Sequence, residues 1–201
     1  MKNILMKIRT RKILILLLTI IILSFISGVL FTAVISDTNK QLVFKTLDNF
    51  FLQISKDQLN YLNAFVSSLS ENLIIMVLIW ILGISIIGIF ITFIFLAIKS
   101  FILGFSLSSI IMYYGLSGVF ISLIYSIPLI VNLFLYLVLS YYSVNFSLML
   151  FNYLFRKKEY NRKIIVRRYL KILFFMVILF IFSSCLETFL VPYILKIFIH
   201  I

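Results

Sequence analysis

The chain has 201 residues, of which 64% are hydrophobic and only 12% are charged. A soluble domain is about half apolar and about a quarter charged, so this composition excludes an ordinary soluble enzyme or binding domain. The net charge of +12 would suggest a nucleic-acid partner in a soluble chain. Here the basic residues cluster at the ends of apolar runs, where membrane proteins contact anionic lipid. We therefore predict an all-α, polytopic protein whose partner is membrane lipid and not nucleic acid.

Five membrane-spanning helices are predicted from the long uncharged runs, because a span needs about 20 consecutive apolar residues. In chain order they cover 13–35, 72–97, 100–115, 117–155 and 172–194. The whole chain, 1–201, is predicted to form one integral membrane domain. Its connecting segments are a basic N-terminus (1–12), an outer loop (36–71) and a basic loop (156–171).

The basic segments set the predicted orientation, because cytoplasmic flanks are enriched in Lys and Arg. The N-terminus carries five basic residues and no acid before residue 13. Segment 156–171 carries eight basic residues and one glutamate. Both are placed in the cytoplasm, and five spans then put the C-terminus outside the cell. The first apolar run is about twice as long as a typical signal-peptide core, which indicates an uncleaved anchor.

The outer loop 36–71 has an amphipathic pattern of its own. Leu47, Phe50, Phe51 and Ile54 follow the i, i+3, i+4, i+7 spacing of one helix face. A second set has the same spacing: Leu62, Phe65, Val66 and Leu69. Two short amphipathic helices are therefore predicted. Their apolar faces either pack on the protein's own helices or form a docking surface for an extracytoplasmic partner.

Lys99 is the only charge between Glu71 and Arg156. One interpretation is a tight turn at the cytoplasmic face between the second and third helices, with the lysine reaching the headgroups. The alternative is a functional charge within the membrane. The third helix is predicted to end at "YYGLSG" (113–118), where two glycines and interfacial tyrosines suit an outer turn.

The fourth helix, 117–155, is too long for one simple span and contains Pro128. An interior proline removes a hydrogen bond and bends or breaks a helix. The sequence therefore predicts a short helical piece over 117–127 and a long helix from Pro128 onward. Breaks of this kind mark binding sites in transporters, although many only serve packing.

The sequence contains no recognisable catalytic or metal-binding constellation. The only histidine is His200, the only cysteine is Cys185, and there is no glycine-rich phosphate loop. We predict neither an enzymatic activity nor a cofactor or metal. The polar residues expected at membrane depth are Asn132, Asn145, Asn152 and Glu187. The asparagines suit interhelical hydrogen bonds, whereas Glu187 serves either such a bond or a role in transport or partner binding.

Four stretches, in order, resemble the stage II sporulation protein M family. They are "LIWILGISIIG" (78–88), the Lys-x-x-x-x-Gly of "KSFILGFS" (99–106), the Ile-Pro of 127–128, and "SSCLETFLVP" (183–192). The resemblance covers nearly the whole chain. Seven positions, here called the landmark residues, carry it: Trp80, Gly83, Gly88, Lys99, Gly104, Pro128 and Glu187.

The resemblance implies a non-enzymatic scaffold in the bacterial cell membrane. The sporulation member of the family holds two peptidoglycan-degrading proteins, stage II sporulation proteins D and P, at the septum during engulfment. Carried over here, no landmark residue is catalytic. In the scaffold hypothesis the 36–71 loop, together with the outer turn, meets the partner domains. The alternative function is a small transporter or permease subunit that uses Glu187 and the helix break at Pro128. A membrane enzyme is disfavoured by the lack of acid–base and metal-binding groups.

Overall fold

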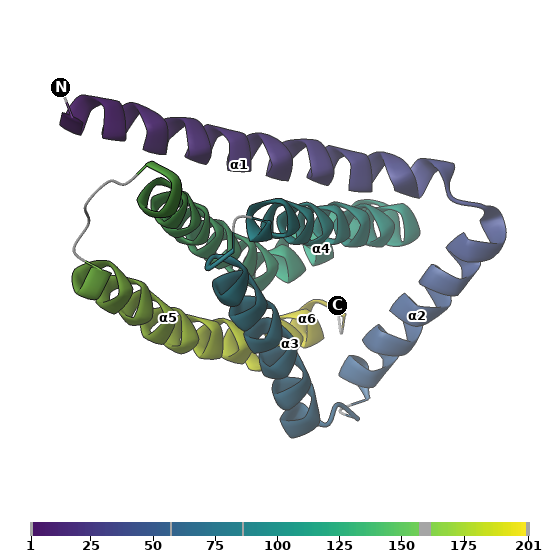
Figure 1. Cartoon of the computed structure of the whole chain (residues 1–201). Coiled ribbons are helices and arrows are strands. Elements are labelled where there is room, and N and C mark those ends of the chain that lie inside the picture. Colours follow the sequence, from purple (N-terminus) through teal and green to yellow (C-terminus); the bar gives the residue numbers. More distant parts are fainter. Residues whose placement is uncertain (1, 57, 86, 157–161, 200–201) are drawn as a thin grey trace.

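The computed structural model of the chain describes residues 2–56, 58–85, 87–156 and 162–199 (Figure 1). Part of the predicted basic loop, 157–161, and His200 lie outside these described residues. No strand occurs in the described ranges. The predicted all-α class is therefore confirmed for this part of the chain.

The helices are α1 Lys2–Val34, α2 Asp37–Ser55, α3 Tyr61–Leu82, α4 Gly88–Arg156, α5 Arg162–Cys185 and α6 Val191–Ile199. A π-helical segment, η1 (Leu186–Leu190), joins α5 to α6. In Figure 1, α1 forms the upper edge of the molecule and runs beside α4. Helices α2, α3 and α5 lie below α1 in this view. The predicted basic loop is helical at both of its ends, since α4 reaches Arg156 and α5 begins at Arg162.

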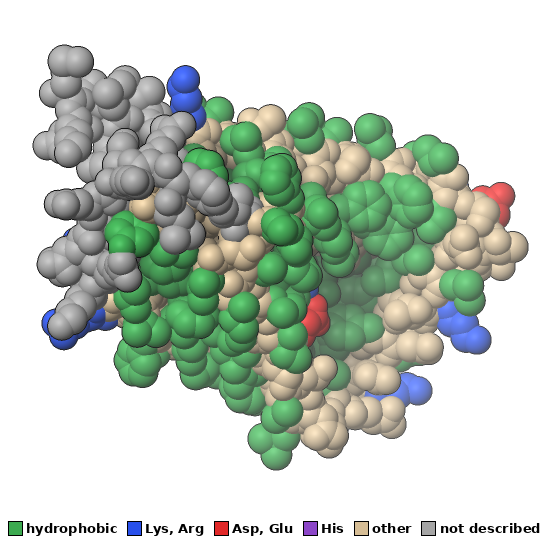
Figure 2. Space-filling view, viewed as in Figure 1, with side chains coloured by type: hydrophobic (Ala, Val, Ile, Leu, Met, Phe, Trp, Pro, Cys, Tyr) green, Lys and Arg blue, Asp and Glu red, His purple; other side chains and the backbone are tan. Residues whose placement is uncertain are grey.

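Four helical stretches among the described residues are long and apolar enough to cross a membrane. They are Arg11–Val34, Tyr61–Leu82, Gly88–Tyr153 and Val166–Lys196. Their outward surfaces carry large exposed apolar side chains, and Figure 2 shows many apolar side chains on one face of the molecule, with polar side chains and backbone between them. In contrast, Ser100, Ser140 and Ser183 are fully buried. Small polar residues between helices and apolar residues outside are typical of helix bundles in lipid.

Helix α4 consists of two arms that meet at Gly115. This glycine has φ 60° and ψ −132°, whereas the rest of α4 keeps helical angles. Only glycine adopts such angles readily, because it has no Cβ. The second arm folds back, so that Gly118 lies against the backbone of Ile110 and Ile111. The predicted turn within 113–118 is thus confirmed.

We expect Gly115→Ala to destabilise the protein by about 1–2 kcal/mol, because an L-residue is strained at this φ. A methyl group there meets no other atom, so the effect would come from the backbone alone. Thermal unfolding in detergent would measure it. Ser117→Ala, at an exposed position two residues on, should leave the midpoint unchanged. Equal midpoints for Gly115→Ala and the wild type would contradict the prediction.

The predicted boundary between the second and third helices at Lys99 is wrong. Helix α3 ends at Leu82 and the chain turns there, so that α4 begins at Gly88 and runs through Lys99. Gly88 is packed against the backbone of Leu82, where a side chain would not fit. Because the turn "GISII" (83–87) is as apolar as the helices that flank it, hydropathy does not distinguish it from them.

The predicted interruption at Pro128 is also wrong. Pro128 lies within the helical second arm of α4, and the only non-helical angles inside α4 are those of Gly115. Helices in membranes tolerate proline because neighbouring helices cover the carbonyl that it leaves without a partner. The separate piece predicted over 117–127 is therefore continuous with the helix after it.

The outer segment contains one separate amphipathic helix, α2, and not two. The second predicted set of apolar residues belongs to the beginning of α3. The apolar face of α2 is turned inward: Phe51 is 6% and Ile54 2% exposed, and Leu47 and Phe50 pack beside them. They contact a cluster formed by Ile110, Ile121, Val191 and Leu195. The prediction of this face as a docking surface is wrong, and the packing alternative is the one that the structure shows.

Helices α1 and α4 approach each other closely at two glycines. A side chain on Gly28 would collide with the backbone of Phe101, and one on Gly104 with the backbone of Phe25. Beside this crossing, the hydroxyl oxygens of Thr32 and Ser108 are 2.7 Å apart. Such close approach lets backbones contact each other and is a common way for membrane helices to associate.

Candidate functional site

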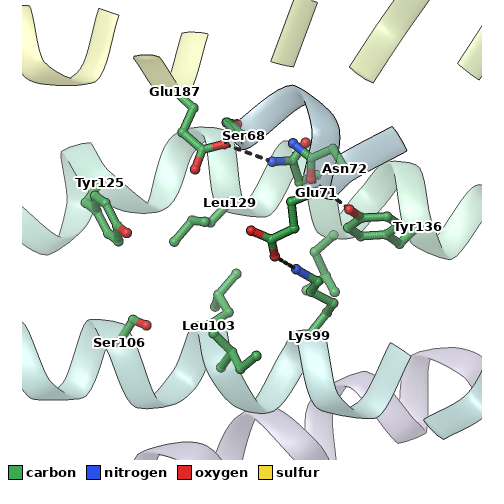
Figure 3. Close-up of a pocket in the computed structure, with 13 residues that line it drawn as sticks. Ser68, Glu71, Asn72, Lys99, Leu103, Ser106, Tyr125, Leu129, Tyr136 and Glu187 are labelled. Atoms are coloured by element: carbon green, nitrogen blue, oxygen red, sulfur yellow. Dashed lines mark hydrogen bonds and ion pairs between the residues drawn. The ribbon is translucent and has the colours of Figure 1, made fainter. Parts of the chain in front are cut away.

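A polar cavity of about 200 Å³ lies between α3, both arms of α4 and η1 (Figure 3). Its polar lining consists of Ser68, Glu71, Asn72, Lys99, Ser106, Tyr125, Asn132, Tyr136 and Glu187. Polar groups are expensive inside a membrane, so a cluster of them there is a candidate functional site.

Lys99 and Glu71 form an ion pair at the centre of this cavity (Figure 3). Glu71 lies eleven residues before the end of α3 at Leu82, and Lys99 lies eleven residues after the start of α4 at Gly88. At about 1.5 Å per residue, both are roughly 16 Å from the α3–α4 turn. With that turn at the membrane surface, the pair lies near the middle of a hydrocarbon core about 30 Å thick.

Glu187 contributes a second carboxylate, held by uncharged donors. Its Oε2 accepts hydrogen bonds from Ser68 Oγ at 2.8 Å and from Asn132 Nδ2 at 3.4 Å. It lies on η1, a short widened turn of a type that often occurs at functional sites. Pro192 follows η1 and has no N–H to donate to the carbonyl of Thr188 in the preceding turn.

A buried hydrogen-bond chain supports the cavity wall. Tyr136 donates to Asn72 Oδ1 at 2.7 Å, and Asn72 Nδ2 donates to Ser184 Oγ at 3.1 Å. These bonds connect the second arm of α4, α3 and the end of α5. Asn132 is different: it is 6% exposed, and its Oδ1 has no hydrogen-bond partner.

The cavity is lined by two carboxylates, those of Glu71 and Glu187, but by only one ammonium among the described residues, that of Lys99. The Glu71 side chain is 64% exposed, so the cavity has an opening on that side. Figure 2 shows a hollow on this face with acidic atoms at its edge. Among the described residues, no three His, Cys, Asp or Glu side chains gather closely enough to hold a metal ion. The arrangement therefore suits a ligand group that donates hydrogen bonds and carries positive charge.

A second cavity, of about 370 Å³, adjoins the first beneath α2. Ser106 and Tyr125 line both cavities. The remaining wall of the second is mainly apolar and includes Phe50, Phe51 and Phe105. A polar chamber is thus continued by an apolar one.

The structure separates the landmark residues. Lys99 and Glu187 line the polar cavity, whereas Gly88 lies at the α3–α4 turn, Gly104 at the α1 crossing, and Pro128 within α4. Trp80 and Gly83 lie together at the end of α3, against Tyr169 of α5. The Tyr169 hydroxyl donates to the Trp80 carbonyl at 2.8 Å, and a side chain at Gly83 would displace it. These two landmark residues therefore serve helix packing.

Sequence reasoning missed Glu71, Ser68, Tyr125 and Tyr136 as site residues. Glu71 was assigned to the outer loop, because the uncharged run begins directly after it. Gly83 and Gly88 flank the α3–α4 turn, and glycines are ordinary turn signals. They could have shown that the helix following Glu71 ends near residue 83. In a helical hairpin that turns at 83–87, Glu71 and Lys99 are equally distant from the turn and fall opposite each other.

The family model described as Stage II sporulation protein M matches residues 15–192. The match includes all seven landmark residues and the whole lining of the polar cavity. No curated protein and no solved structure matches the chain.

Proposed function

Because the chain belongs to the stage II sporulation protein M family, we propose that it is a non-enzymatic scaffold of the bacterial cell membrane. It anchors and recruits peptidoglycan-degrading proteins for the membrane migration of engulfment during sporulation. The observation that carries this proposal is the family match. It spans residues 15–192, which are 178 of the 201 residues. The hydrolytic chemistry belongs to the partners.

The scaffold crosses the membrane five times in this proposal, because each arm of α4 makes a separate crossing. The first arm covers 88–114 and the second 116–156. Each exceeds the roughly 20 residues that a span needs. The basic N-terminus and the basic residues around 156–171 are cytoplasmic by the positive-inside rule. Helix α2, the Gly115 turn and the C-terminus are then outside the cell.

The partner proteins, stage II sporulation proteins D and P in the resemblance, contact the exposed face of α2. Leu42, Lys45, Asn49 and Leu52 form an exposed stripe on this helix at helical spacing. The opposite face, with Phe51 and Ile54, holds α2 on the bundle. A charge at Phe51 would therefore detach α2 from the bundle and would not report on docking.

We expect Leu52→Asp to abolish recovery of peptidoglycan hydrolases when the tagged, full-length protein is purified from its sporulating host. Leu52 is 50% exposed, so the new carboxylate should not unfold α2. The matched control is Leu116→Asp, which places the same charge at an 88% exposed residue beside the Gly115 turn. Wild type and control should both retain the hydrolases. Their absence from the wild-type sample would contradict the scaffold proposal.

A transporter or permease subunit is the second candidate, and the polar cavity favours it. Ionisable groups at membrane depth often belong to transport pathways. This function predicts that an ATP-hydrolysing subunit or a solute-binding protein replaces the hydrolases in the purified sample. It also predicts that Glu187→Gln stops transport while assembly survives. The scaffold function predicts that Glu187→Gln leaves hydrolase recovery unchanged.

A further inference from the structure

Glu187 is the carboxylate of the polar cavity that has no cation beside it. In the described part of the chain it is hydrogen-bonded by Ser68 and Asn132, both uncharged. Glu71, in contrast, is paired with Lys99, which is the only basic residue among those described that line the cavity. Two carboxylates against one ammonium leave one negative charge in excess. Because a charge at membrane depth is costly without a partner of opposite sign, the cavity suits one monovalent cation.

The hydrogen-bonding groups of the cavity indicate what kind of cation this is. Asn132 is 6% exposed, and its Oδ1 accepts no hydrogen bond. The hydroxyls of Ser106 and Tyr125 also line the cavity and can donate, but they carry no charge, and each can equally accept. A primary ammonium group has three N–H donors. It can therefore serve Glu187, Asn132 Oδ1 and one hydroxyl oxygen at the same time.

The size of the cavity and its surroundings restrict the rest of the ligand. A volume of about 200 Å³ corresponds to roughly six or seven water molecules of about 30 Å³ each, so only a small molecule fits. The second cavity lies toward α2, and its wall contains Phe50, Phe51 and Phe105. A ligand that reaches the polar cavity from the α2 side passes these rings. Their faces attract an organic ammonium, whereas an inorganic ion would lose hydration against an apolar wall.

We propose that the polar cavity binds one small, water-soluble molecule with a single primary ammonium group and a short hydrocarbon part. The ammonium pairs with Glu187 and donates to Asn132 Oδ1, while Lys99 stays paired with Glu71. The hydrocarbon part points toward the second cavity. A ligand with two ammonium groups would again leave the cavity with an unbalanced charge. The site goes beyond the scaffold function and does not depend on it.

The test compares three probes of equal size on the purified, full-length protein in detergent, at constant ionic strength. Butylammonium has N–H donors and a positive charge, tetramethylammonium has the charge without N–H donors, and 1-butanol has no charge. Butylammonium should raise the thermal unfolding midpoint in a saturable manner, because a ligand that binds only the folded state stabilises it. It should bind about tenfold more tightly than tetramethylammonium, as expected for charged hydrogen bonds.

Glu187→Gln should remove the stabilisation by butylammonium, because it keeps the size of the side chain and loses its charge. The matched control is Asp37→Asn, which removes a carboxylate at an exposed position on α2, outside both cavities, and should keep the stabilisation. No stabilisation of the wild type by butylammonium would overturn the proposal, whatever the variants do. Equal stabilisation by tetramethylammonium, 1-butanol or sodium chloride would overturn it too, as would a folded Glu187→Gln protein that still responds to butylammonium.

Discussion

Replacing Gly28 with leucine should separate α1 from α4 and prevent stable accumulation of the protein. Even a methyl group at Gly28 would collide with the carbonyl of Phe101, which is backbone and cannot rotate away. Excess volume in a packed interior costs about 1–3 kcal/mol where neighbours can shift. Here whole helices must move apart, so we expect about that cost for Gly28→Ala and loss of the packed state for Gly28→Leu. Gly104 is predicted to behave in the same way.

A cysteine pair at Thr32 and Ser108 can measure this separation directly. Their hydroxyl oxygens are 2.7 Å apart, so Thr32→Cys/Ser108→Cys should form a disulfide efficiently in a Cys185→Ser background. Adding Gly28→Leu should abolish the disulfide. The control is Ala33→Leu, which places a leucine at an exposed position of α1. Undiminished cross-linking with Gly28→Leu would show that α1 does not contact α4 through this glycine.

The membrane class and the helical character of the chain could be predicted from composition, because lipid requires long apolar helices. The turn at Gly115 was also predictable, since glycines and interfacial tyrosines coincide there. The end of α3 was not recognised, because its turn is apolar and lies inside one uncharged run. Hydropathy measures how apolar a segment is, and two apolar helices joined by an apolar turn give one continuous signal.

The same limitation hid most of the candidate site. Because the predicted helix covered 72–97, whereas α3 covers Tyr61–Leu82, Lys99 fell at a predicted turn and Glu71 in a loop. No pairing between them could then be inferred. Glu187 and Asn132 were recognised as polar residues at membrane depth, but their contact spans 55 positions along the chain. The inward orientation of Phe51 depends on the cluster around Ile110 and Val191, which only tertiary packing creates. Amphipathic spacing identifies a face but does not identify what covers it.

Neutralising Lys99 alone should destabilise the protein more than neutralising Lys99 and Glu71 together. Lys99→Gln leaves the Glu71 carboxylate at membrane depth without its cation, and an unpaired charge in a medium of low dielectric constant is costly. Lys99→Gln/Glu71→Gln removes both charges and leaves two amides that can hydrogen-bond to each other. The double variant should therefore recover much of the stability that either single variant loses.

The double-mutant cycle gives the expected size of this coupling. Removing one partner of a fully buried pair costs about 3–5 kcal/mol, but the Glu71 side chain is 64% exposed to the cavity opening. Screening there reduces the interaction, so we expect a coupling energy of about 1–2 kcal/mol. Thermal or denaturant unfolding of the four proteins in the same detergent would determine it.

The ion pair between Asp37 and Lys40 on α2 is the matched control for this cycle. It joins the same charge types at 3.6 Å, and Asp37 is almost fully exposed. An exposed pair of this spacing contributes about 0.5 kcal/mol or less, so its cycle should be nearly additive. Additive effects at Lys99 and Glu71 as well would mean that their charges do not stabilise each other. The Lys99–Glu71 contact could then not be what holds α3 against the first arm of α4.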